Sequence, residues 1–160
     1  MRVSIVAVGR QKRGPEQELF EIYRGRTLAQ GRALGISEIA LRELPESGAQ
    51  TSALRREDEA RRILGQIDDR AVVVALDEHG REFTSEGFAQ ALQSWIETGA
   101  PEVAFLLGGP DGHGEAVMSR ARFIVALGRM TWPHGLARVL LAEQLYRSVT
   151  ILLNHPYHRG

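Results

Sequence analysis

Short apolar runs that end in glycine or a polar turn constrain this chain more than any other feature of its sequence. Four such runs are Val3–Val8, Ala71–Leu76, Val103–Leu107 and Phe123–Leu127. Continuous apolar runs of about five residues are typical of parallel strands that are covered on both faces. Helical patterns lie between the runs, so the chain is predicted to alternate strands and helices around one mostly parallel sheet.

The intervening segments carry the start signals of helices. A proline in the first turn or a hydroxyl side chain at the N-cap precedes three of them: Pro15, Thr51 or Ser52, and Thr84 or Ser85. A short helix is predicted near Glu115–Arg120, a long one after His134, and a fifth strand within Ile36–Leu44. The order βαβαβαβαβα predicts an α/β, three-layer sandwich in a single domain over residues 1–160.

Composition excludes several classes of protein. The chain has no cysteine, which excludes disulfides, a thiol nucleophile and a cysteine-based metal site. No apolar run approaches the roughly 20 residues that span a bilayer. The N-terminus reads as a strand and lacks a signal-peptide cleavage pattern, so we expect the protein to stay in the cytosol.

Charge is balanced overall but unevenly distributed. Residues 1–32 hold seven Lys and Arg against three Glu, and residues 129–160 hold four Arg and three His against one Glu. The acidic side chains therefore concentrate in the middle of the chain. The basic ends predict either a joint basic face for an anionic partner or ordinary solvated surfaces, and the charge pattern alone favours neither.

The ends of the last strands predict a ligand site. Ligands of open α/β sheets bind beyond the carboxyl ends of the strands. Gly108–Gly112 follows one predicted strand and Gly128–His134 the next, and Asp77–Gly80 is predicted to be a third loop at a strand end. The glycines suit either close backbone approach to a ligand or a plain tight turn. Asp77–His79 has no second ligand cluster at suitable spacing, so no metal site is predicted.

The C-terminal region has two further features. The helix after His134 is apolar around most of its girth, which predicts a subunit contact, with Leu140 and Leu141 as candidates, or else packing in the core. The last residues, His155–Arg159, combine imidazoles, a phenol and a guanidinium, a set suited to stacking on bases and holding phosphates. No Ser-His-Asp, Cys-His or paired-carboxylate arrangement is present, which disfavours hydrolysis.

Several motifs together resemble one family. They are Val6–Gly9, Leu76-Asp77, Gly108–Gly112, Met130–His134 with Arg138 and Glu143–Arg147, and Asn154–Arg159. In this combination the whole chain resembles the bacterial ribosomal RNA large subunit methyltransferase H family of the SPOUT superfamily. The resemblance implies methyl transfer from S-adenosyl-L-methionine to N3 of a pseudouridine in helix 69 of 23S rRNA within the ribosome. It also implies a homodimer and a C-terminal trefoil knot.

The resemblance also assigns residues. It implies a cofactor site formed by Leu76, Gly108, Leu127, Gly128, Arg129, Met130, Thr131 and Trp132. It implies substrate positioning, with no base assigned, by His134, Arg138, Arg147, Tyr157, His158 and Arg159. This chain carries Ala126 and Gly128 where serine is common in relatives.

Two other classes of function stay open on the sequence. One is a Rossmann-like hydrolase or nucleotide-binding enzyme, although no nucleophile or metal set is present. The other is a non-catalytic ribosome-binding factor that uses the basic ends. Binding of S-adenosylmethionine would distinguish the methyltransferase from both.

Overall fold

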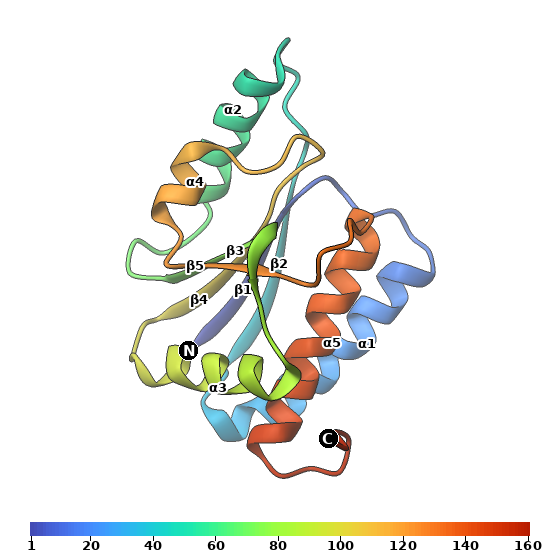
Figure 1. The fold of residues 1–160 in the computed structure, drawn as a ribbon. Coiled ribbons are helices and arrows are strands. Elements are labelled where there is room, and N and C mark those ends of the chain that lie inside the picture. Colours follow the sequence, from blue (N-terminus) through green and yellow to red (C-terminus); the bar gives the residue numbers. More distant parts are fainter.

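A five-stranded parallel sheet forms the centre of the computed structural model, which describes residues 1–160 (Figure 1). The strands are β1 (Arg2–Val8), β2 (Glu38–Leu44), β3 (Val72–Glu82), β4 (Glu102–Leu107) and β5 (Phe123–Ala126). Their order across the sheet is β2-β1-β4-β3-β5, and every neighbouring pair is parallel. The α/β three-layer prediction is therefore confirmed.

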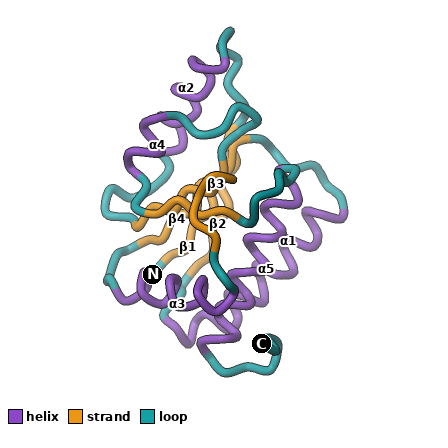
Figure 2. The backbone as a smooth tube through the Cα atoms, in the orientation of Figure 1, coloured by secondary structure: helices purple, strands orange, loops and turns teal.

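Helices cover both faces of the sheet (Figure 2). They are α1 (Pro15–Gly31), α2 (Ser52–Leu64), α3 (Ser85–Glu97), α4 (Glu115–Arg120) and α5 (His134–Leu152), with a short 3-10 helix at Arg32–Leu34. Helix α5 packs against α1 and α3 on one face, and α2 packs against α4 on the other. No helix combines the length and the apolar character that crossing a bilayer requires.

The alternation of side chains along each strand builds two separate cores. In β1, Val3 and Ile5 join the core beneath α1, α3 and α5, whereas Val6 and Val8 join the core beneath α2 and α4. Successive side chains of a strand point to opposite faces, so an uninterrupted apolar run supplies both cores. The predicted helix caps are present: the Thr51 and Thr84 hydroxyls accept hydrogen bonds from Leu54 N (3.1 Å) and Gly87 N (3.0 Å).

One predicted loop is wrong. Asp77–Gly80 does not end the strand, because β3 continues to Glu82 and meets β5 a second time. Leu76 and Arg81 both lie beside Val125, and the residues between them form an irregularity in the register. The backbone of Gly80 crosses β5 so closely that an added Cβ would lie 2.8 Å from the carbonyl carbon of Ile124. In Figure 1 this end of β3 passes in front of β5.

Most apolar side chains of helix α5 pack in the core. Leu141 is fully buried in the core beneath α1 and α3, so it is not available as a subunit contact. Leu140 is half-buried and stays a candidate. Core packing, the alternative explanation of the all-round apolar pattern, therefore accounts for much of it. The dimer and the knot stay predictions.

Candidate cofactor and substrate site

A pocket of about 840 Å³ lies beyond the ends of β4 and β5, beside residues Leu76–His79 of β3. The central parts of these strands are neighbours in the sheet, so their carboxyl-terminal loops meet at one edge. Seven of the eight residues assigned to the cofactor by resemblance line this pocket: Leu76, Gly108, Leu127, Gly128, Met130, Thr131 and Trp132. Arg129 is not among the lining residues, whereas His134 is.

The two glycine-containing loops have backbone shapes that require glycine. Gly112 (φ +84°) and Gly128 (φ +112°) lie in the left-handed region, where a Cβ is disfavoured. A serine at position 128 would be strained, so the glycine found there fits the loop. A Cβ at Gly108 would lie 3.0 Å from the Gly112 carbonyl carbon, which shows how tightly the first loop folds onto itself.

Side chains of the second loop are exposed at the pocket. Met130 keeps 74% of its surface exposed and Trp132 41%. The Trp132 Nε1–H donates to the Leu127 carbonyl (3.3 Å), and the Thr131 hydroxyl donates to Glu78 Oε2 (2.8 Å). The loop is thus tied to the extension of β3, while its apolar side chains stay free to cover a ligand.

Polar groups from β3 and from the loop after β4 line the same pocket. Asp77, Glu78 and His79 come from β3, and His113 from the loop after β4. His113 Nε2 lies 3.1 Å from the Leu106 carbonyl oxygen. A carbonyl only accepts, so Nε2 carries the proton and the buried Nδ1 is left without a partner. Burial lowers the pKa of His113, so its ring is neutral near pH 7.

Helix α2 holds the loop after β4 in place. Arg55 donates to both carboxylate oxygens of Asp111, at 2.7 and 3.2 Å. These hydrogen bonds from the guanidinium hold the pKa of the Asp111 carboxyl below its ordinary value. The bidentate pair joins two segments 56 residues apart in the chain and fixes one wall of the pocket.

Arg138, assigned to the substrate by resemblance, has partners inside the protein. Its side chain is 2% exposed and donates to Glu43 Oε2 and to the Gly9 carbonyl oxygen. Glu43 Oε2 also accepts from Gln11 N (2.6 Å). In this arrangement Arg138 ties the start of α5 to the ends of β1 and β2. It thereby positions the helix that begins at His134.

The chain end forms a second cluster of assigned residues. The Tyr157 hydroxyl donates to Glu143 Oε1 (3.0 Å), its ring lies 4.6 Å from the Tyr146 ring, and the Arg147 guanidinium lies over it at 4.8 Å. His158 lies 3.1 Å from Arg147 NH1. Burial, aided by neighbouring hydrogen bonds, raises the pKa of Tyr157 well above its ordinary value.

The tail is also joined to helix α3. His158 Nε2 lies 2.7 Å from Glu86 Oε1, and this hydrogen bond lowers the pKa of the Glu86 carboxyl. Arg159 is exposed. The substrate residues therefore fall into two groups within one protomer. Arg147 is thirteen residues along α5 from His134, about 20 Å at 1.5 Å per residue.

Comparisons with known proteins identify the family. A family model described as "Predicted SPOUT methyltransferase" matches residues 1–158. The chain is 48% identical over 160 residues to the ribosomal RNA large subunit methyltransferase H of Brucella anthropi, covering 100% of both chains. It is also 48% identical over 160 residues to that of Methylobacterium sp. (strain 4-46), covering 100% of this chain and 99% of the relative.

The chain belongs to the ribosomal RNA large subunit methyltransferase H family. The resemblance inferred from the motifs is thereby confirmed, and the enzyme class is an rRNA large subunit methyltransferase. SPOUT methyltransferases take the methyl group from S-adenosylmethionine, which is therefore the cofactor of this family. A solved structure, the SpoU methyltransferase AviRb from Streptomyces viridochromogenes in complex with AdoMet, is a distant match. It shares 13% identity with a TM-score of 0.42, covering 96% of this chain and 61% of that one.

Sequence reasoning underestimated three parts of the pocket in this methyltransferase. Asp77–His79 were predicted as a loop near the site and rejected as metal ligands, and they line the pocket from the continuing strand. Arg56 and His113 were not singled out, and both are lining residues. The one available signal was the position of His113 directly after Gly112, within the loop that was already predicted to approach a ligand.

Proposed function

We propose that this chain transfers a methyl group from S-adenosylmethionine to N3 of a pseudouridine in helix 69 of 23S rRNA, acting on assembled ribosomes in the cytoplasm. The observation that carries the proposal is the convergence on one pocket of the loops after β4 and β5 with the stretch Leu76–His79 of β3. Full-length identity of 48% to relatives named for rRNA methylation supports the substrate class.

The pocket suits the cofactor in shape and charge. The backbone of the glycine loops offers N–H and C=O groups to an adenine edge, and Leu76, Leu127 and Met130 offer apolar contacts to its faces. Asp77 and Glu78 line the same pocket. Their carboxylates favour the sulfonium and ammonium charges of S-adenosylmethionine. This division of polar and apolar groups supports cofactor binding.

Transfer requires little from the protein beyond alignment. The methyl carbon forms a bond to N3 as its bond to sulfur breaks, S-adenosylhomocysteine leaves, and the N3 proton passes to solvent. Correct positioning supplies much of the acceleration in such reactions. Helix α5 begins at His134 in the pocket lining, so the positive end of its dipole favours the anionic base that loss of the N3 proton creates.

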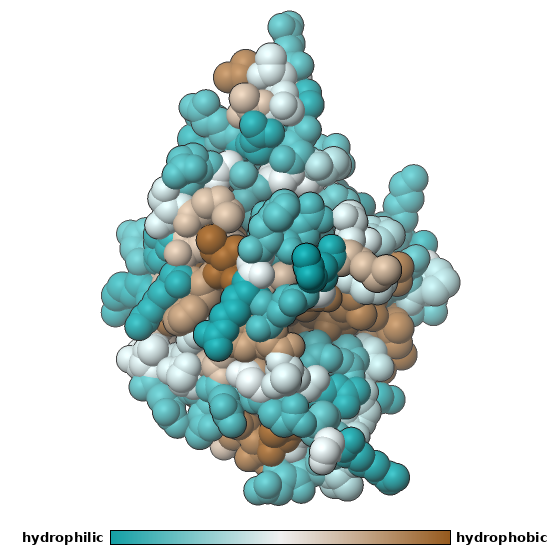
Figure 3. Space-filling model, viewed as in Figure 1, coloured by the Kyte–Doolittle hydropathy of each residue, from teal (hydrophilic) through white to brown (hydrophobic).

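A homodimer would join the two groups of substrate residues. The tail cluster lies about 20 Å from the pocket of its own protomer, judged by the rise of α5. An antiparallel pair of α5 helices would bring each tail toward the other protomer's pocket. Figure 3 shows apolar side chains gathering over the side formed by α1 and α5. Exposed Leu19, Ile22 and Leu136 belong to these helices and support contact there.

The test of the reaction uses radiolabelled S-adenosylmethionine with isolated ribosomes that lack the modification. We expect label in the large-subunit rRNA and a methylated pseudouridine by nucleoside mass spectrometry. Free 23S rRNA is the control for the requirement for an assembled particle, and it should accept far less label. Label on another nucleoside would contradict the proposed target, and no label on any rRNA would contradict the reaction.

The test of the dimer uses two inactive variants. One lacks Tyr157–Gly160 and the other carries Gly128→Val, which strains the loop at the cofactor pocket. If the tail serves the partner's pocket, a mixed dimer contains one complete site, so mixing should restore up to a quarter of the wild-type activity. Monomers at micromolar concentration in ultracentrifugation, or no recovery despite subunit exchange, would contradict the arrangement.

A further inference from the structure

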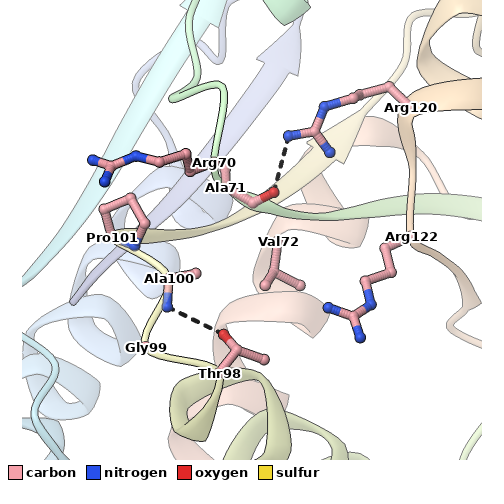
Figure 4. Close-up of a pocket in the computed structure, with 9 residues that line it drawn as sticks. All are labelled: Arg70, Ala71, Val72, Thr98, Gly99, Ala100, Pro101, Arg120 and Arg122. Carbon is pink, nitrogen blue, oxygen red and sulfur yellow. Dashed lines mark hydrogen bonds between the residues drawn. The ribbon is translucent and has the colours of Figure 1, made fainter.

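A second pocket lies at the amino-terminal ends of the strands, opposite the cofactor pocket (Figure 4). It has a volume of about 330 Å³ and is formed where β3 and β4 begin and where the chain enters β5. Six residues of a parallel strand such as β4 span about 20 Å, which separates the two pockets. Its lining includes Arg70, Arg120 and Arg122 and no acidic side chain.

The charges at this edge are unequally compensated. Buried Glu102 accepts hydrogen bonds from Arg2 (3.2 Å) and Arg42 (3.4 Å), and Asp68 lies 3.5 Å from Arg70. Neither Arg120 nor Arg122 forms an ion pair, because no carboxylate oxygen lies within 4.0 Å of either guanidinium group. Two full positive charges near one pocket repel each other unless an anion joins them.

The geometry of the two uncompensated arginines directs them at the pocket. In Figure 4 the guanidinium groups of Arg120 and Arg122 point inward from the segment before β5, whereas Arg70 points away. Arg120 NH2 donates to the carbonyl oxygens of Asp69 (2.9 Å) and Ala71 (3.0 Å), which fixes its orientation. The Arg122 guanidinium makes no hydrogen bond within the protein and lies 5.6 Å from the Phe123 ring. Its donors are free for a ligand.

We infer that this pocket binds a backbone phosphate of the rRNA substrate through Arg120 and Arg122. Guanidinium groups match the geometry of phosphate oxygens, and phosphate contacts fix the register of a nucleic acid without reading its bases. Only three of the nine lining residues are hydrophobic, which favours a charged group over an apolar one. A phosphate held about 20 Å from the methyl donor would orient the RNA that enters the cofactor pocket. The inference deepens the proposed function and rests on it for the identity of the RNA.

The experiment compares charge-neutralising variants in binding to ribosomes by sedimentation, without cofactor. We expect Arg122→Gln to weaken binding about fivefold, and Arg120→Gln with Arg122→Gln to weaken it further. The slope of log affinity against log salt concentration should become shallower by about 0.7–0.9 for each phosphate that the variant no longer neutralises. Arg122→Lys, which keeps the charge, should recover most of the affinity.

Arg61→Gln is the matched control. It removes the same charge from an exposed arginine on α2 that is already paired with Asp58 at 2.8 Å, so its affinity should stay within twofold of wild type. Affinity for S-adenosylmethionine and kcat at saturating ribosomes should not change in Arg122→Gln, while KM for ribosomes rises. Thermal unfolding checks that the Arg120 variant, which loses two hydrogen bonds to backbone, is folded.

Two results would overturn the inference. One is wild-type affinity and salt dependence in both the single and the double variant. The other is an equal loss in Arg61→Gln, which would show an effect of overall charge alone. Because sedimentation needs no methyl transfer, its outcome is separate from that of the reaction. Ribosomes bound through Arg122 but not methylated would contradict the proposed function and leave the phosphate site intact.

Discussion

The two ends of the sheet present different chemical groups to their proposed ligands. At the carboxyl ends of the strands, glycine loops present backbone groups and apolar side chains, and the half-buried ring of His113 is held neutral. At the amino edge, charged side chains dominate: Glu102 is buried and bonded to arginines, while Arg120 and Arg122 face a pocket without carboxylates. Backbone groups suit a ligand of fixed shape, whereas guanidinium groups suit the oxygens of a phosphate. One parallel sheet thereby carries both the proposed cofactor site and the proposed RNA contact.

The largest effect on stability is expected at Gly80, where β3 crosses β5. Gly80→Ala would place a methyl group 2.8 Å from backbone atoms of Ile124 and Val125. Overpacking costs about 1–3 kcal/mol even where side chains can adjust, and backbone adjusts less. We expect a large fall in Tm and loss of cofactor binding. Gly48→Ala, at a position with nothing within 4 Å, is the control, and an unchanged Tm in Gly80→Ala would refute the close crossing.

The next effect separates the tail from the cofactor pocket. Deletion of Tyr157–Gly160 removes the ring that packs on Tyr146 and the hydroxyl bonded to Glu143. We expect methylation of ribosomes to fall at least a hundredfold, while calorimetry finds cofactor affinity within a few-fold of wild type. Tyr157→Phe, which keeps the ring, should lose less activity. Loss of cofactor binding on deletion would mean that the tail closes the cofactor pocket instead.

A smaller effect is expected from a side chain that the fold does not need. Met130 is 74% exposed and lines the pocket, so Met130→Ala should leave Tm unchanged. If the side chain covers the adenine, affinity for S-adenosylmethionine should fall about tenfold, or about 1.4 kcal/mol. Leu54→Ala, at another exposed apolar position, is the control. Wild-type affinity in Met130→Ala would remove this residue from the cofactor site.

The smallest effect concerns pH and distinguishes the two edges. Burial lowers the pKa of His113, so its contribution to stability is present above the unfolded value near 6.5 and is lost as pH falls below it. Burial raises the pKa of Glu102, but hydrogen bonds from Arg2, Asp68 N and Ser4 lower it more. Its contribution is lost only below about pH 4.5, the unfolded value.

Thermal unfolding across pH should therefore show two declines on acidification. His113→Leu should flatten the decline that begins near pH 6.5, and Glu102→Gln should flatten the decline below about pH 4.5 while lowering Tm at neutral pH. Leu replaces the ring by an apolar side chain of similar reach, so the wall of the pocket stays filled. An unchanged pH profile in both variants would mean that neither His113 nor Glu102 sets the acid stability.

The order of the elements and the glycine loops of the proposed cofactor site could be predicted from local sequence. Apolar runs fix the strands, and Thr51 and Thr84 fix helix starts, because these signals act over a few residues. The glycine loops were predicted to line a site for the same reason. Asp77–Gly80 was mistaken for a turn because only the crossing with β5, some 45 residues away, keeps that polar segment extended. Arg138 was assigned to the substrate by resemblance, and its bonds to Glu43 and Gly9 could not be predicted because the partners lie 95 and 129 residues away in the chain.

The place of β5 in the sheet has a consequence for how the chain folds during synthesis. Until residues 123–126 are added, β3 has no neighbour on one side, and its apolar stretch Val72–Leu76 is an open edge. Open apolar edges pair with other chains and aggregate. A nascent chain released before β5 would therefore lack a wall of the cofactor pocket. It would also expose the unpaired side of β3, so we expect truncated products to be insoluble.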